Sequence, residues 1–373
     1  MYPKVTVTKA SLPDFEDYIK MLKPLWESRQ ITNMGKYHQM LEEQLEDFFQ
    51  VPYVSLMVNG HLSLELAIQA MGFPEGGEVI TTPFTFISTT HAIVRNHLKP
   101  VFCDIKLSDY TIDESRIEDL ITEKTVAILP VHVYGNICNV EAIESLARKY
   151  QLKVIYDAAH AFGESIDGRS AAGFGDASVF SFHATKVFTT VEGGAVTFSN
   201  REMYDKLYNL KNFGIRSEEL VTEVGANAKM NEFCAAMGLC NLRTIHEKIS
   251  SRRQRAEYYL EQLEPLSGLK LPEYDTKRVK YSYGYFPVLF QKDEHGISLR
   301  DKVYSELKLK GILARKYFYP ITSDEVCFKN KYKNVSLNNA RFAAANILVL
   351  PLYPDLELND ISTICQTVRE CLK

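Results

Sequence analysis

The sequence predicts an α/β fold in which a mostly parallel sheet, covered by helices on both faces, precedes a smaller α+β domain. Between residues 53 and 198, short runs rich in Val, Ile and Phe alternate with helical segments of about ten residues, the pattern of parallel strands joined by helices. After a long charged helix at 245–263, this alternation gives way to shorter mixed segments. We therefore expect a large domain at 1–245 and a small domain at 246–373.

The composition supports a globular protein without a general affinity for polyanions. A chain of 373 residues, 46% hydrophobic and 24% charged, is long enough for two domains with ordinary cores. Lys plus Arg number 43 against 47 Asp plus Glu, a net charge of −4. This balance gives no electrostatic case for binding nucleic acid or an anionic membrane. Any phosphate-bearing ligand must be held by a local site.

The cysteines and the N-terminus indicate a cytoplasmic protein. The seven cysteines form neither a Cys-x-x-Cys pair nor a spacing suited to zinc, and such a set fits a reducing compartment. Residues 1–15 lack the apolar run of a signal peptide, and we expect no segment to span a bilayer.

The large domain follows from strand and helix signals in order. Residues 12–50 predict mostly helix around a break at 32–35, and a strand at 54–58 leads through Gly60 into an apolar helix. Further strands are predicted at 78–83, 100–104, 125–130 and 153–157, with helices ending near Val94 and Ile121 and a helix at 140–150.

The second half of the chain is mixed. We expect a basic helix at 206–216, a polar loop at 225–232 entering a helix to Leu242, and the long helix at 245–263. Later segments predict strands at 281–290 and 347–352, helices at 299–309 and 358–372, and a basic aromatic strand or loop at 315–320.

Lys186 lies between two runs of Val and Phe, 178–182 and a second run ending at Phe198, which we interpret as buried strands. In a partly desolvated site a lysine amine can lose its proton and attack a carbonyl. A solvated loop lysine is the other interpretation. Asp157 supports the first interpretation without deciding between the two, because the strand that it ends and strand 178–182 would deliver both residues to one carboxyl edge of a parallel sheet.

An acid and a lysine at that edge are what pyridoxal phosphate needs, because the lysine forms a Schiff base and the carboxylate pairs with the ring nitrogen. Phe86 is a candidate to lie against the ring. The Gly60 turn and Ser181 are candidates for the phosphate, since a helix N-terminus offers free N–H groups. Spacing alone leaves open that Asp157 caps the next turn and that Phe86 belongs to the core.

Three motifs make the pattern more specific. Asp157-Ala-Ala-His-Ala-Phe-Gly163, Ser181-Phe-His-Ala-Thr-Lys186 and Glu192-Gly-Gly194 resemble those of the DegT-type nucleotide-sugar aminotransferases. These are pyridoxal-phosphate enzymes of the aspartate-aminotransferase fold (fold type I), and the resemblance extends from Thr32 to Pro354. It implies that Lys186 bonds to the cofactor and moves the proton, that Asp157 pairs with the ring nitrogen, that His160 lies beside the ring and that Phe86 stacks on it.

The resemblance also implies a phosphate site shared between subunits. Ser181 and the Gly60 turn would hold the phosphate, and Asn227 in a Gly-x-Asn motif would reach the phosphate of the neighbouring subunit, so the active unit would be a homodimer. The family commonly has Gly-Ser or Gly-Thr at this turn, whereas here His61 follows Gly60. Whether the His61 ring donates to the phosphate is left open.

The segment 315–320, Arg-Lys-Tyr-Phe-Tyr-Pro, places two cations beside three aromatic rings. That suits a sugar nucleotide, with cations for the diphosphate and rings for the sugar or base, although an ordinary strand with a basic edge is the alternative. The family uses this region for the acceptor. The predicted substrate contacts are Arg315, Tyr317 and Tyr319, with Thr32 and His183 as further sugar contacts.

Together with 131–135 and 227–232, the match is most similar to enzymes that make dTDP-4-amino-4,6-dideoxyglucose. It implies transfer of an amino group from L-glutamate to a dTDP-4-keto-6-deoxy sugar. The alternatives are the same chemistry on a 3-keto sugar and a non-catalytic regulator that binds the cofactor as a sensor. A sugar dehydratase on this fold would have histidine in place of Lys186.

Overall fold

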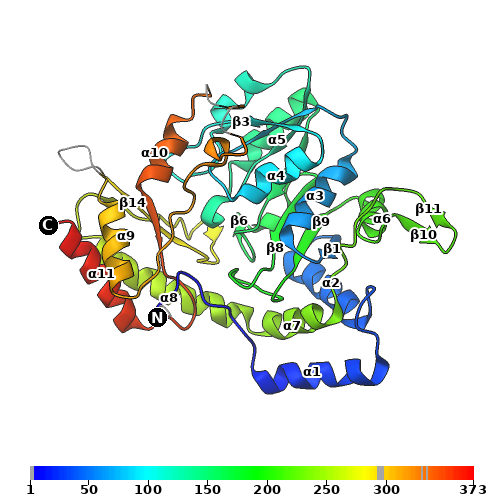
Figure 1. The fold of residues 1–373 in the computed structure, drawn as a ribbon, viewed down its shortest axis with the longest axis horizontal. Helices are drawn as coiled ribbons and strands as arrows, with labels where there is room; N and C mark the ends of the chain where they lie inside the picture. Colours follow the sequence, from blue (N-terminus) through cyan, green and yellow to red (C-terminus); the bar gives the residue numbers. More distant parts are fainter. Residues whose placement is uncertain (1–3, 292–297, 329–330, 333–334) are drawn as a thin grey trace.

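The structure, a computed structural model, describes residues 4–291, 298–328, 331–332 and 335–373. Its centre is a seven-stranded sheet of order β1-β9-β8-β5-β4-β2-β3 (Figure 1). The strands are β1 (Tyr53–Met57), β2 (Glu78–Thr81), β3 (Lys99–Phe102), β4 (Thr125–Leu129), β5 (Lys153–Asp157), β8 (Ala177–Ser181) and β9 (Gly194–Phe198). The strands from β3 to β8 pair in parallel, and β9 is antiparallel to both of its neighbours. The mostly parallel sheet is confirmed.

Helices cover both faces of this sheet. The covering helices are α2 (Lys36–Phe49), α3 (Gly60–Met71), α4 (Ile87–Arg95), α5 (Val140–Tyr150), α6 (Arg201–Leu210) and α7 (Glu232–Arg243). In β1, Val54 and Leu56 pack into the cluster that contains α2 and α7, whereas Met57 packs with α3 on the other face. Strands buried on both faces explain the nearly continuous apolar runs of the sequence.

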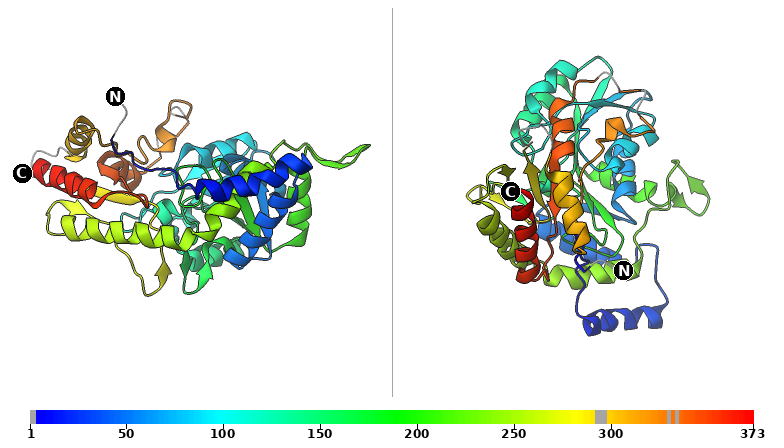
Figure 2. Two further views of the ribbon diagram at one scale, coloured as in Figure 1. Left: turned by 90° about the horizontal axis from the view of Figure 1, so that it is seen from below. Right: turned by 60° about the vertical axis from the view of Figure 1, so that its left-hand side comes forward.

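The long helix α8 (Ile245–Leu263) leads into the C-terminal part of the chain (Figure 2). There an antiparallel sheet of order β12-β14-β15 combines Leu269–Lys270, Phe286–Phe290 and Ile347–Leu350. The helices of this part are α9 (Arg300–Leu309), α10 (Asn338–Asn346) and α11 (Leu358–Cys371). One buried cluster contains residues of β1, α8, β14 and α11, so a shared core joins the two parts, and the division at 245/246 stays a prediction.

Two elements stand apart from the body. Helix α1 (Phe15–Ser28) packs on α7, where the ring centroids of Trp26 and Phe233 are 5.7 Å apart. The hairpin of β10 (Ile215–Ser217) and β11 (Leu220–Val221) projects away from the sheet (Figures 1 and 2).

A separate small sheet joins β6 (Ser165–Ile166), β7 (Arg169–Ser170) and β13 (Val279–Lys280).

Three expectations about secondary structure were wrong. The helix ending at Ile121 is replaced by the 3-10 turns Glu114–Arg116 and Glu118–Leu120. The helix expected at 206–216 begins earlier, because the Asn200 side chain caps the N–H of Glu202, and ends at Leu210. The strand expected at 281–290 is confined to 286–290, because Tyr283 adopts a left-handed backbone conformation with φ of 53°. The sequence reasoning also missed α10.

Within the described residues, no helix is both long and apolar enough to cross a bilayer. The same residues contain no group of three or more His, Cys, Asp or Glu side chains placed to hold a metal ion.

Candidate active site

Asp157 and Lys186 lie at the same carboxyl edge of the sheet, the position that the strand pattern predicts for both. Asp157 is the last residue of β5, and its backbone pairs with Val179 of β8, whose following loop carries Lys186. Thr89 Oγ1 donates a hydrogen bond to Asp157 Oδ2 over 2.8 Å, and the Ala159 N–H donates to Oδ1 over 3.1 Å. Burial raises the pKa of the Asp157 carboxyl, while Thr89, Ala159 and the charge of Lys186 act in the opposite direction.

Lys186 is half-buried in a compact loop. Its backbone N–H donates to the His183 carbonyl over 2.9 Å, and the Thr190 N–H returns to the Phe182 carbonyl over 3.0 Å. The side chain leaves this loop so that Nζ donates to the phenolic oxygen of Tyr285 over 3.1 Å. The lysine is therefore held in a defined direction and is not the solvated loop residue of the alternative interpretation.

His160 is a buried, neutral ring beside this pair. Its Nδ1 accepts the backbone N–H of Tyr134 over 3.1 Å, which places the ring proton on Nε2. Burial and then the charge of Lys186 hold the pKa of His160 well below its ordinary value. The ring stacks on Phe318 with centroids 5.8 Å apart and packs against Tyr285 at 4.5 Å.

The start of α3 forms a cradle with β8 and β9. A Cβ atom on Gly60 would lie 2.7 Å from Ser181 Cβ and 3.0 Å from its Oγ, and one on Gly194 would lie 2.7 Å from the Gly60 nitrogen. Asn59 accepts the N–H groups of Leu62 and Ser63. The other N–H groups in the first turn of α3 have no partner within the helix and can donate to an outside acceptor. The Ser181 hydroxyl lies beside this turn.

The His61 ring is already engaged by protein groups. Nδ1 lies 2.8 Å from Ser88 Oγ, and Nε2 lies 2.9 Å from Glu65 Oε1. Because both ring nitrogens have partners, the donors available at this turn are backbone N–H groups and the Ser181 hydroxyl. This arrangement disfavours the idea that the His61 ring binds a phosphate.

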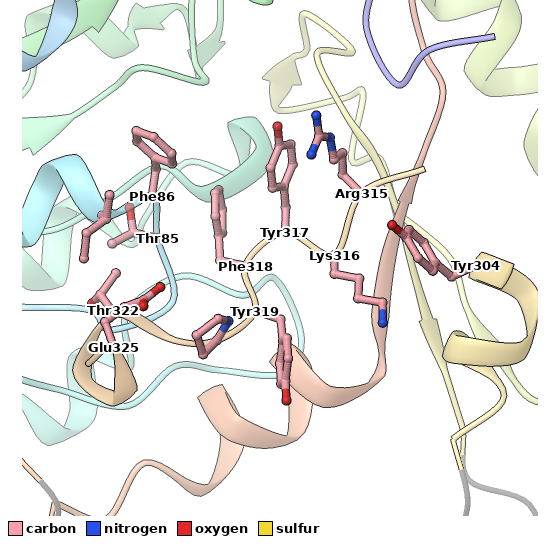
Figure 3. Close-up of a pocket in the computed structure, with 12 residues that line it drawn as sticks. Thr85, Phe86, Tyr304, Arg315, Lys316, Tyr317, Phe318, Tyr319, Thr322 and Glu325 are labelled. Carbon is pink, nitrogen blue, oxygen red and sulfur yellow. The ribbon is translucent and has the colours of Figure 1, made fainter. Parts of the chain in front are cut away.

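A cavity of about 310 Å³ lies next to Phe86 and is lined largely by the segment 315–320 (Figure 3). Phe86 precedes α4 and is 58% exposed, so it is a wall of the cavity and not core. Arg315 and Tyr317 extend to the same side as Phe86, whereas Tyr319 extends to the opposite side. The Tyr319 ring lies 5.3 Å from the Arg300 guanidinium. The structure therefore brings Phe86 and the predicted acceptor segment together.

The predicted site residues that line this cavity are Phe86, Arg315, Tyr317 and Tyr319. The other predicted residues, Lys186 and Asp157 among them, are not part of its lining, and three of them are exposed. His183 is exposed, with Nδ1 2.8 Å from Thr185 Oγ1. Thr32 is exposed in the loop between α1 and α2. Asn227 is exposed, and its Oδ1 accepts from Lys229 Nζ over 3.1 Å. Within the described part of this chain, no recorded contact joins Thr32 or Asn227 to Lys186, so their roles stay predictions.

Sequence reasoning missed three residues of this site. Thr89 could have been suggested by its spacing, because it lies three residues after Phe86 in the first turn of a short helix, but the burial of its hydroxyl became known only from the structure. Tyr134 contributes a backbone N–H, which any residue type could supply. Tyr285 is 99 positions from Lys186, and no local spacing connects the two.

Comparisons with known proteins agree with this geometry. Residues 14–369 match the family described as "DegT/DnrJ/EryC1/StrS aminotransferase family". The chain is 42% identical over 370 residues to a dTDP-4-amino-4,6-dideoxy-D-glucose transaminase of Shigella dysenteriae, covering 99% of this chain and 100% of that one.

Solved structures share the fold. The chain superposes with a TM-score of 0.93 and 31% identity on DesI crystallised with its TDP-sugar product, covering 100% of this chain and 93% of that one. A Streptococcus pneumoniae protein described as a "putative sugar aminotransferase", in its PLP form, gives a TM-score of 0.89 at 25% identity, with 97% of this chain and 98% of that one covered.

Proposed function

Because the chain belongs to the DegT/DnrJ/EryC1/StrS aminotransferase family, we propose that it uses pyridoxal phosphate to aminate a dTDP-linked 4-keto-6-deoxy sugar. The observation that carries this substrate is the 42% identity, over nearly the whole chain, to a dTDP-4-amino-4,6-dideoxy-D-glucose transaminase. We further propose L-glutamate as the amino donor and dTDP-4-amino-4,6-dideoxyglucose as the product.

The residues present fit pyridoxal phosphate. Asp157 is a buried carboxylate whose desolvation a protonated ring nitrogen would offset. Lys186 is the amine beside it. The cradle of Gly60, Ser181 and Gly194 is closed to a Cβ atom but offers N–H and hydroxyl donors, which suits a phosphate group. Phe86, exposed at the cavity wall, supplies a face for the ring.

Bound pyridoxal phosphate supplies an aldehyde for amino groups and a ring that accepts the electron pair released when a proton leaves the substrate carbon. Lys186 Nζ takes that proton and returns it to a neighbouring carbon. Asp157, held by Thr89 and Ala159, keeps a negative charge where the ring nitrogen would lie. His160 is neutral and presents its Nε2–H as a donor that does not compete with Lys186 for protons.

The cavity beside Phe86 is the proposed acceptor site. Arg315 supplies a cation for a diphosphate, and Tyr317 supplies an aromatic surface for a sugar. The hydroxyl of Tyr134 donates to the Tyr317 carbonyl, so the loop that orients His160 also fixes the acceptor segment. Tyr319 extends to the other side and is the weaker candidate for a sugar contact.

We propose a homodimer in which Asn227 completes the partner's phosphate site. Lys229 Nζ donates hydrogen bonds to Oδ1 of Asn212 and to Oδ1 of Asn227. Because the Asn227 oxygen is used in this way, its amide NH₂ group is left as a donor for a phosphate. Helix α1 and the β10–β11 hairpin bear exposed apolar side chains that suit burial against a second subunit; these are Phe15, Trp26, Leu220 and Val221.

The seven cysteines are all free, which fits the proposed cytoplasmic compartment.

Lys186→Ala tests the proposed chemistry. Without the amine, turnover should fall by roughly 1,000-fold or more because the nucleophile and proton carrier are the same atom. Borohydride should fix pyridoxal phosphate to the unmodified protein at Lys186, as read by peptide mass, but not to the variant. The exposed Lys277→Ala change serves as the control. Undiminished turnover by Lys186→Ala would refute the assignment.

The acceptor is tested by offering dTDP-4-keto-6-deoxyglucose and its 3-keto isomer separately with L-glutamate. We expect a 4-amino sugar from the first and at most traces of product from the second. A 3-amino product in excess would replace the proposal with the 3-keto alternative. Failure to consume either sugar, together with unchanged cofactor absorbance in the presence of glutamate, would favour the regulator.

A further inference from the structure

Tyr285 is the side chain that contacts the reacting atom of Lys186. Lys186 Nζ donates to its phenolic oxygen over 3.1 Å, and the nitrogen lies 5.8 Å from the centre of its ring. Among the described residues, the Tyr285 phenolic oxygen is the side-chain atom that accepts a hydrogen bond from Lys186 Nζ. Neither the motifs nor the proposed mechanism gives Tyr285 a role.

Tyr285 is fixed in place from both sides along the chain. Phe286, the next residue, begins β14 and pairs with Leu350 of β15. On the other side, the Ser282 N–H and hydroxyl donate to the buried Glu164 carboxyl over 3.1 and 2.7 Å. A Cβ atom on Gly284 would lie 3.1 Å from Val187 Cγ2, so this segment packs closely on the residue next to Lys186.

The groups around Tyr285 come from several elements. The His160 ring lies 4.5 Å from its ring and the Tyr134 ring 5.8 Å. The buried Arg252 guanidinium and the Tyr317 phenol both interact with it electrostatically. None of these four groups is a carboxylate. A positive charge on Lys186 therefore has the neutral phenol as its direct partner, with Asp157 further away as the negative charge that it interacts with.

We propose that Tyr285 is a catalytic residue whose phenolic oxygen accepts a hydrogen bond from Lys186 while the lysine carries the transferred proton. The proposal rests on the proposed aminotransferase function. A proton leaves the substrate carbon, its bonding electron pair stays with the substrate and cofactor, and Nζ becomes an ammonium. The Tyr285 phenolic oxygen accepts a hydrogen bond from one of the three N–H groups of this ammonium and keeps its own proton. The ammonium then returns the proton to the neighbouring carbon and becomes neutral again.

A neutral acceptor suits this task better than a carboxylate would. A carboxylate in contact with Nζ would form an ion pair that retains the proton and slows its return. A hydrogen bond to a charged group stabilises that group substantially. If the bond to the Lys186 ammonium is lost, the rate of proton transfer should decrease by roughly 10- to 100-fold. Tyr285 thus stabilises the ammonium but still allows the proton to leave.

Tyr285→Phe in the holoenzyme tests the proposal, with Tyr283→Phe as the matched control. Tyr283 lies on the same segment and is buried, but it has no recorded contact with Lys186. In single turnover with L-glutamate, we expect the absorbance change of the cofactor to slow by roughly 10- to 100-fold in Tyr285→Phe and by less than about twofold in Tyr283→Phe. The KM for glutamate should stay unchanged.

A second measurement needs no sugar and no turnover. In the pyridoxamine form of the holoenzyme Lys186 is a free amine, so trinitrobenzenesulfonate can label it, and peptide mass spectrometry reads the label. Loss of the acceptor disfavours the ammonium, so in Tyr285→Phe the labelling of Lys186 should begin at lower pH than in the unmodified protein. Labelling and single-turnover rates that match those of Tyr283→Phe would overturn the proposal. If the unmodified enzyme is inactive with the proposed substrates but the labelling pH of Lys186 still shifts in Tyr285→Phe, the result would contradict the proposed substrates and not the role of Tyr285.

Discussion

Glu164 is deeply buried, and no ion pair joins its carboxyl to a cation of the described residues. It is 2% exposed, its Oε1 accepts from Ser282, and Oε2 has no hydrogen-bond partner among the described residues. Burial raises the pKa of Glu164 to about 8, so the folded protein keeps a proton that the unfolded chain releases from about pH 4.5 upward. Stability should therefore fall as the pH rises from about 4.5 to 8, and the loss is complete above the folded pKa.

Glu164→Gln should remove this pH dependence, because an amide keeps an oxygen for Ser282 but cannot ionise. We expect the variant to be more stable than the unmodified protein at pH 8, by up to about 4 kcal/mol, and to lose that advantage near pH 5. Urea unfolding at the two pH values measures the difference. The exposed Glu247→Gln change is the control, and parallel pH profiles for Glu164→Gln and the unmodified protein would contradict the prediction.

At the same scale, the sequence pointed to candidate residues by their type and spacing, and the structure shows where they lie. Asp157 and Lys186 were predicted at one sheet edge because each follows a recognisable strand. Tyr285 and Thr89 were not, because their roles depend on contacts between segments far apart in the chain. His61 shows the converse: its position was predicted at the α3 turn, but Ser88 and Glu65 decide where its ring points.

Among the secondary-structure elements, the junction of α3 with β8 leaves no room for a side chain at Gly60. Gly60→Ala would place a Cβ 2.7 Å from Ser181 Cβ and 3.0 Å from the Ser181 Cα, so the helix start and the strand must move apart. The N–H groups of α3 and the Ser181 hydroxyl would then no longer converge. We expect the dissociation constant for pyridoxal phosphate to rise by roughly tenfold or more, as measured by absorbance titration of the apoprotein.

Gly173→Ala is the matched control for this change. No heavy atom lies within 4 Å of the Cβ that alanine would add at Gly173, so affinity for the cofactor should be unchanged. Equal affinities in the two variants would show that the α3–β8 junction does not hold the phosphate. Melting temperatures of both proteins separate a local effect from general destabilisation.

The elements themselves were largely predictable where periodicity is strong. The helices at 140–150 and 245–263 and the strand at 153–157 have the predicted bounds. The prediction failed where one residue changes the backbone direction inside an apolar run, as Tyr283 does before β14. Helix α10 was missed because its sequence, Asn338 to Asn346, has an Ala-rich buried face without clear amphipathic spacing.

For the whole molecule, the predicted fold type I architecture is confirmed by the TM-score of 0.93 with DesI. The predicted aminotransferase family is confirmed by the match over residues 14–369. A single chain nevertheless leaves Asn227 without a recorded contact to its own Lys186, although both were predicted to serve one kind of site. A sequence does not state which contacts lie within a chain and which lie between chains, so the shared site stays a prediction.

Subunit mixing tests the shared site directly. Chains carrying Lys186→Ala lack the amine, and chains carrying Asn227→Ala lack the proposed phosphate donor, so each homodimer should be impaired. In a mixed dimer, the site with an intact Lys186 would receive Asn227 from its partner and be fully native. Random exchange of equal amounts makes about half of the dimers mixed with one native site each, so activity should recover to about a quarter of the unmodified value. If Asn227 serves its own subunit, no site in the mixture has both residues, and activity should stay at half of that measured for Asn227→Ala alone.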